Sequence, residues 1–209
     1  MCINAEVSIS AFIFCSITCI YLYMRNKMND RWIAIFFGYI GIMQLFEYLM
    51  WIDQECSGLN QLATDLGFIH NILQPVLSLL VAYLMEKKLP KWIYIPLFVY
   101  IIYSIPKIIK SKKKGQCSKP CSDKNIGLSW EYTNTEQLNK VWLIFTIAAC
   151  IPFLTMKKNG SIYFTLLIGT YILSIFIAQN RCQGAIIPSN GSWWCLMASL
   201  IPLSAIFIN

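Results

Sequence analysis

Two polar residues stand inside an otherwise apolar run near the start of the chain. The segment QLFEYLMW, residues 44–51, places Gln44 three positions before Glu47. Residues three apart on a helix share one face, so the amide and the carboxylate are expected to lie side by side. Because an ionised carboxylate among apolar groups is costly unless it is paired, we expect Glu47 to face other polar side chains.

Further polar side chains occur where they can meet Glu47. The apolar segment 66–85 carries His70, the only histidine of the chain, on the same helix face as two amides. The apolar segment 161–178 is followed closely by Arg181. Arg181 or His70 is therefore the predicted partner of Glu47. The predicted polar pocket comprises Glu47, His70, Gln44, Gln74, Asn71, Arg181, Cys2 and Glu6.

Three kinds of function fit this set of side chains. A carboxylate, an imidazole and amides can bind a small polar molecule, a cation or a proton, as a binding or transport protein does. The same carboxylate and imidazole can act as acid and base in a membrane-embedded enzyme, with Cys2 as nucleophile or metal ligand. The set can also be a hydrogen-bond cluster that only holds helices together in a structural protein. We favour the first function, and the sequence predicts no particular cofactor.

The cysteines form two groups. Cys15, Cys19 and Cys150 lie within apolar runs. Six others fall on or near one side of the predicted helices and are disulfide candidates: Cys2, Cys56, Cys117, Cys121, Cys182 and Cys195. Such confinement to one face is typical of an oxidising exterior or lumen, where cysteines pair. The pairing cannot be derived from spacing, and the segment QCSKPCS leaves a metal site or redox pair at Cys117 and Cys121 open.

The composition is that of a membrane protein. Hydrophobic residues make up 57% of the chain and charged residues 13%, which lies outside the range of ordinary soluble domains. Seven apolar runs come near the length that crosses a ~30 Å hydrocarbon layer as a helix. They lie at about 7–24, 32–52, 66–85, 92–109, 141–156, 161–178 and 193–208. We therefore predict one all-α domain over residues 1–209, a polytopic seven-transmembrane helix bundle with an exposed loop rich in Lys and Cys at 110–140.

Charged residues and cysteines together predict the orientation. No Lys or Arg precedes the first run, whereas Arg25, Lys27 and Arg31 follow it, which favours an amino terminus outside. The lysines of segment 110–114 oppose this orientation, because they would lie on the outer side. The confinement of six cysteines to one side decides between the two possible orientations in favour of the one with the amino terminus outside. We predict an integral membrane protein with its amino terminus outside or lumenal and its carboxyl terminus in the cytoplasm.

The opening MCINAEVS and the segment QLFEYLMW together resemble an uncharacterised family of seven-helix membrane proteins. Members of that family open with MCFSA followed shortly by Ser, and carry Q-x-x-E-G-x-x-W in the second span. The matching positions are Cys2, Ala5, Ser8, Gln44, Glu47 and Trp51. Ile3 and Asn4 depart from the opening, and Tyr48 replaces the glycine of the motif. The resemblance implies the topology and the importance of the cluster around Glu47, and it brings no reaction with it. The composition, rich in Ile, Lys and Asn, also resembles that of proteins encoded by AT-rich genomes, such as those of large DNA viruses.

Several membrane chemistries lack their required residues. Retinal proteins need a lysine in the last span, and residues 193–208 contain none. Seven-helix zinc hydrolases of the ceramidase type need several histidines, and this chain has one. The net charge of +7 comes mainly from loops that flank the membrane, so no nucleic acid is expected as a partner. The expected partners are the lipid bilayer and a small polar ligand or cation.

Overall fold

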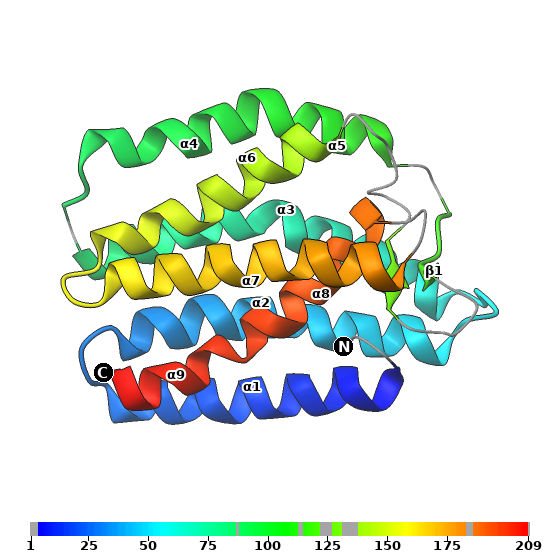
Figure 1. Cartoon of the computed structure of the whole chain (residues 1–209), viewed down its shortest axis with the longest axis horizontal. Helices are drawn as coiled ribbons and strands as arrows, with labels where there is room; N and C mark the ends of the chain where they lie inside the picture. The colour runs from blue at the N-terminus through cyan, green and yellow to red at the C-terminus, as the bar shows by residue number, and fades with distance from the viewer. Residues whose placement is uncertain are drawn as a thin grey trace.

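Long apolar helices make up most of the protein and run side by side along one axis (Figure 1). The computed structural model describes residues 4–86, 88–112, 115–121, 127–130, 138–182 and 186–208. The longer helices are α1 (Ala5–Arg25), α2 (Asp30–Ile52), α3 (Leu59–Glu86), α6 (Leu138–Cys150), α7 (Gly160–Arg181) and α8 (Ile186–Ser199). The shorter ones are α4 (Tyr94–Val99), α5 (Ile105–Ser111) and α9 (Ile201–Ile208).

The helices have the length and composition of membrane spans. Within the described ranges, six helical segments are long and apolar enough to cross a membrane: Ala5–Arg25, Asp30–Ile52, Leu59–Glu86, Lys91–Ser111, Gly160–Arg181 and Ser189–Ile208. The segment Lys140–Thr155 is apolar but shorter, and it ends in the 3-10 helix Ile151–Thr155. These findings confirm the predicted all-α class and indicate an integral membrane protein.

Three further predicted spans differ from the observed elements. Helix α3 begins at Leu59, before the apolar run at 66–85, so its first turns extend beyond that run. The span predicted at 92–109 is divided into a 3-10 turn (Lys91–Ile93), α4, a π-helical segment (Tyr100–Ser104) and α5. Pro96 and Pro106 lie on either side of that π-helical segment, where their missing N–H groups interrupt the regular hydrogen-bond pattern. The last span begins before Trp193 because α8 starts at Ile186.

Small residues let the first helices pack closely. A Cβ atom added at Gly41 would lie 2.8 Å from the Cys15 sulfur, and one added at Gly38 would lie 3.7 Å from Cys19 Cβ. These two glycines face α1 one turn apart. Close contact between helix backbones through small residues is the usual packing of membrane helices, since lipid offers no hydrophobic drive for association.

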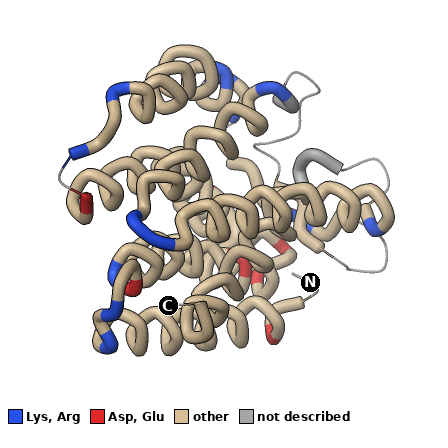
Figure 2. The backbone as a smooth tube through the Cα atoms, turned by 60° about the vertical axis from the view of Figure 1, so that its left-hand side comes forward, with Lys and Arg blue, Asp and Glu red and all other residues tan. Residues whose placement is uncertain are grey.

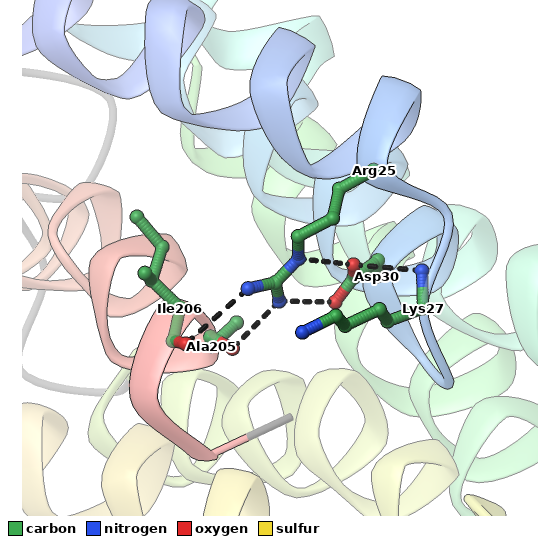
Figure 3. A network of polar contacts seen from close by, with 5 residues as sticks. All are labelled: Arg25, Lys27, Asp30, Ala205 and Ile206. Atoms are coloured by element: carbon green, nitrogen blue, oxygen red, sulfur yellow. Dashed lines mark hydrogen bonds and ion pairs between the residues drawn. The ribbon is translucent and has the colours of Figure 1, made fainter.

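An ionic network joins the connection between α1 and α2 to the end of α9, at the end of the bundle opposite the β strands (Figure 3). Arg25 Nε and Nη2 donate to the two carboxylate oxygens of Asp30, at 2.7 and 2.8 Å. The same guanidinium donates to the backbone carbonyls of Ala205 and Ile206 at the end of α9. Asp30 is fully buried, so the guanidinium both neutralises it and caps the carboxyl end of α9.

A disulfide-bonded cap covers the other end of the bundle. It consists of residues 115–121 and 127–130, which contain the strands β1 (Lys119–Pro120) and β2 (Leu128–Ser129). Cys56–Cys117 ties the cap to the turn between α2 and α3, and Cys121–Cys182 ties it to the end of α7. Ser118, Leu128 and Trp130 are nearly or fully buried. Within this described part of 110–140, for which the sequence predicted an exposed loop, Cys117, Ser118 and residues 127–130 are buried against the helices, whereas Gly115 and Lys119 are exposed.

The turn between α2 and α3 is organised by one carboxylate beneath this cap. Asp53 accepts hydrogen bonds from the backbone N–H groups of Asn60 and Ser57, each at 2.8 Å. The Ser57 hydroxyl donates to it as well. These donors, with the Asn60 N–H contributing most, lower the pKa of Asp53 to about 2.

Candidate functional site

Glu47 lies inside the bundle and is fully buried. It sits on α2 with Gln44 one turn before it, and Gln44 Nε2 donates to Glu47 Oε2 at 3.0 Å. Met43 and Met50 flank Glu47 on the same helix face, since the three residues are four and three positions apart. The carboxylate therefore points at a neighbouring helix and not at lipid.

That neighbouring helix is α3, which approaches α2 closely at Gly67. A Cβ atom at Gly67 would lie 2.9 Å from the Met43 methyl carbon and 3.3 Å from that of Met50. Further along α3, Gln74 Nε2 donates to Asn71 Oδ1 at 2.8 Å. Gln74 is fully buried, and its Oε1 has no hydrogen-bond partner among the residues that the structure describes. An acceptor oxygen is thus available near the layer of Glu47.

Helix α8 closes the cluster with a thiol. The buried side chain of Cys195 interacts with the Gln74 amide and electrostatically with the Glu47 carboxylate. One thiol of α8 therefore interacts with a polar group of α2 and with a polar group of α3. We call Gln44, Glu47, Asn71, Gln74 and Cys195 the intramembrane cluster.

The cluster belongs to a longer file of buried polar residues on α3. Asn60, Thr64, Asn71, Gln74 and Ser78 are each at most 2% exposed, and with Gly67 they follow spacings of four and three that keep them on one helix face. At the cap end, Ser118 N donates to Asn60 Oδ1 at 2.9 Å, and the hydroxyls of Thr64 and Ser118 lie 3.0 Å apart. We call this row of residues the polar seam. It runs from the cap to the intramembrane cluster.

An aromatic layer lies beyond the other end of the seam. Phe36 contacts Phe153 edge-on with ring centroids 5.0 Å apart, and Trp32 and Phe37 pack on the same Phe153 ring. All four rings are at most 1% exposed. The described polar side chains of α3 therefore continue toward the cap, whereas the other end of the bundle interior is packed with rings.

His70 lies beside the cluster in an aromatic setting. Its ring stacks on Tyr39 with centroids 3.9 Å apart and meets the edge of Phe46 at 5.6 Å. The Tyr39 hydroxyl donates to the His70 backbone carbonyl at 3.0 Å. The structure therefore gives His70 contacts with α2 rings, whereas Glu47 accepts a hydrogen bond from Gln44 and interacts electrostatically with Cys195.

The other predicted pocket residues lie elsewhere. Arg181 is exposed in the last turn of α7, next to Cys182, and Glu6 is exposed in the first turn of α1. Both side chains are exposed, whereas Glu47 is fully buried. Cys2 lies outside the described residues. Of the predicted pocket, the structure brings together Gln44, Glu47, Asn71 and Gln74.

The cysteine predictions have mixed outcomes. Four of the disulfide candidates form the two disulfides of the cap, and Cys117 and Cys121 belong to different disulfides, so they are no metal or redox pair. Cys195 is a free, buried thiol within α8, so its place among the disulfide candidates was wrong. The reason is that α8 begins earlier than predicted and carries Cys195 into the bundle. No group of three or more His, Cys, Asp and Glu side chains within the described ranges could hold a metal ion.

Sequence reasoning missed the contribution of α8. Ser189, Ser192, Cys195 and Ser199 are all nearly or fully buried and recur every three or four positions. This small polar stripe is the signal that could have identified α8 as a helix facing the cluster. The stripe could not be recognised from the sequence because the segment SNGS has a composition typical of a loop. Packing of Trp130 against Gly191 shows instead that the cap covers this part of the helix.

Comparison with known proteins places the chain without assigning an activity. No curated protein and no solved structure matches it. One family model matches residues 6–207, which is nearly the whole chain, in agreement with the expected membership of an uncharacterised family. The chain belongs to this family of unknown function (DUF5765).

Proposed function

We propose that this protein binds a small cation or a proton at Glu47, within a bundle of seven membrane-crossing helices whose capped end faces the exterior or a lumen. Two disulfides at the capped end support this orientation, because disulfides persist in oxidising compartments. The exposed Lys27, Arg31, Lys157 and Lys158 at the opposite end support it as well, since cytoplasmic loops are enriched in Lys and Arg.

The complete burial of Glu47 carries this proposal. Holding a charge at the centre of a membrane helix costs about 2.5–3.5 kcal/mol even on the lenient insertion scale. A glutamine at this position would make similar hydrogen bonds without that cost. A carboxylate is therefore best explained by a function that uses its charge or its proton.

The neighbouring groups suit a hard cation or a proton. Glu47 offers carboxylate oxygens, and Gln74 offers the buried Oε1 without a hydrogen-bond partner among the described residues. Oxygen ligands of this kind are those that hard cations such as Na⁺ and Ca²⁺ prefer. The polar seam supports entry from the capped end, because its polar side chains continue from the cluster to Ser118.

The enzymatic alternative has less support from the geometry. Its acid–base pair required Glu47 and His70 to act together, and the His70 ring instead stacks on Tyr39 and meets the edge of Phe46. A purely structural role is favoured by one observation, the hydrogen bond from Gln44 to Glu47. The structural and binding roles predict different behaviour when the carboxylate is removed.

The test compares thermal unfolding of purified wild type and Glu47→Gln across pH, with Li⁺, Na⁺, K⁺ or Ca²⁺ added. A bound cation or proton stabilises the folded state by mass action, so wild type should show a cation- or pH-dependent shift that Glu47→Gln lacks. Glu86→Gln, a matched change of charge at the end of α3, should keep the shift. If Glu47→Gln is at least as stable as wild type and both proteins respond identically to every cation and pH, Glu47 is a structural residue and the proposal fails.

A further inference from the structure

Two loops meet at the end of the bundle opposite the cap. The turn 26–29 joins α1 to α2, and the turn 156–159 precedes α7. Asn29 Nδ2 donates to the Lys158 backbone carbonyl at 2.5 Å, which holds the two turns together. Asn159 Nδ2 donates in turn to the carbonyl of Ile208 at the end of α9. The relative position of the two loops is thus fixed by hydrogen bonds between chain segments far apart in sequence.

This contact brings four exposed cations into one surface. They are Lys27, Arg31, Lys157 and Lys158, which we call the basic patch. Figure 2 shows Lys and Arg concentrated near this end of α1, α2 and α7. The nearby Asp30 does not reduce the charge of the patch, because it is fully buried and its two oxygens are held by Arg25. The next described carboxylate at this end is Glu86, on α3.

The patch lies where lipid headgroups would surround the protein. It occupies the ends of apolar helices that are long enough to cross a membrane. Arg31 stacks over the ring of Tyr23, 5.2 Å from its centroid, and Tyr23 is 49% exposed. An exposed Tyr beside an exposed Arg at a helix end is typical of the interface between hydrocarbon and water.

We propose that the basic patch binds the headgroups of anionic phospholipids in the adjacent leaflet. Lysine and arginine both donate to phosphate oxygens, and arginine can do so through two parallel hydrogen bonds. The proposal is independent of Glu47 and of its ligand.

The experiment titrates short-chain phosphatidylglycerol into the purified full-length protein in uncharged detergent and follows its melting temperature. Phosphatidylcholine of the same chain length and inorganic phosphate are titrated in parallel. We expect a saturable rise in melting temperature with phosphatidylglycerol, and little change with either comparison compound. Native mass spectrometry of the same samples should show retained phosphatidylglycerol.

Two triple variants with equal loss of charge make the result specific. Lys27→Gln/Lys157→Gln/Lys158→Gln removes most of the patch, whereas Lys110→Gln/Lys119→Gln/Arg181→Gln removes exposed cations near the capped end. Each cation near an anionic surface contributes roughly fivefold to binding, so the patch variant should bind phosphatidylglycerol on the order of 100-fold more weakly. The control variant should bind like wild type. Equal weakening in both variants, unchanged binding in the patch variant, or an equal response to phosphatidylcholine or inorganic phosphate would overturn the proposal.

Discussion

Arg25 should be among the most sensitive positions of the bundle, because removing its guanidinium leaves a buried carboxylate behind. The Asp30 side chain is 0% exposed and that of Arg25 only 11% exposed, so solvent screens their ion pair weakly (Figure 3). Breaking a buried pair by removing one partner costs about 3–5 kcal/mol. The hydrogen bonds to Ala205 and Ile206 are lost as well, at about 0.5–1.5 kcal/mol each. We therefore expect Arg25→Met to lower the free energy of unfolding by roughly 4–8 kcal/mol.

The assay is reversible unfolding of the detergent-solubilised protein by increasing fractions of sodium dodecyl sulfate. The double variant Arg25→Met/Asp30→Asn should recover most of the loss, because neither side chain then leaves an uncompensated charge. Arg181→Met is the matched control, since Arg181 is exposed at the other end of the bundle. The reasoning is refuted if Arg25→Met costs no more than Arg181→Met, or if the double variant is no more stable than the single one.

Three further predictions concern the cap, its turn and the packing of α1. The pKa of Asp53 is lowered to about 2 in the folded protein. The stability that Asp53 contributes is therefore complete above its unfolded pKa near 3.8 and is lost as pH falls toward about 2. Thermal unfolding measured between pH 5 and pH 2 should show this loss of stability in wild type and a smaller loss in Asp53→Asn. The Cys121–Cys182 disulfide joins residues 61 positions apart, and the loop-closure entropy of a loop of that length corresponds to a stabilisation of about 4 kcal/mol. Cys121→Ser/Cys182→Ser should therefore unfold at a clearly lower temperature than wild type. Its unfolding temperature should also change less than that of wild type when a reducing agent is added. Gly41→Ala should destabilise the protein by about 1–3 kcal/mol, because its Cβ would lie 2.8 Å from the Cys15 sulfur, and Cys15→Ala in the same chain should restore most of that loss in the same unfolding assay.

Hydropathy predicted the first two helices well because their apolar runs are long and uninterrupted. The prediction of 7–24 compares with the observed Ala5–Arg25, and that of 32–52 with Asp30–Ile52. The start of α8 was missed for a physical reason. Its Ser, Asn and Gly residues are polar and small in sequence, but contact with the cap and with other helices buries them, and a sequence window cannot detect such contacts.

The sequence also predicted one part of the candidate site and left another part open. Helical spacing predicted that Gln44 and Glu47 share a face, and the hydrogen bond between them follows from that spacing. The same spacing could not identify Cys195 as a neighbour of Glu47, because their approach depends on how α8 packs against α2. Pairing of the cap cysteines is likewise a property of tertiary structure, since sequence alone leaves every pairing open.

Infrared difference spectroscopy of the purified protein tests the role of Glu47 most directly. Spectra recorded with and without Na⁺, and with and without Ca²⁺, at a series of pH values report whether a buried carboxyl group gains or loses its proton. We predict a carboxyl band that changes with pH or with an added cation in wild type, and that is missing from Glu47→Gln and retained in Glu86→Gln. A wild-type spectrum without any such change, or a change that persists in Glu47→Gln, would contradict the proposal that Glu47 binds a cation or a proton.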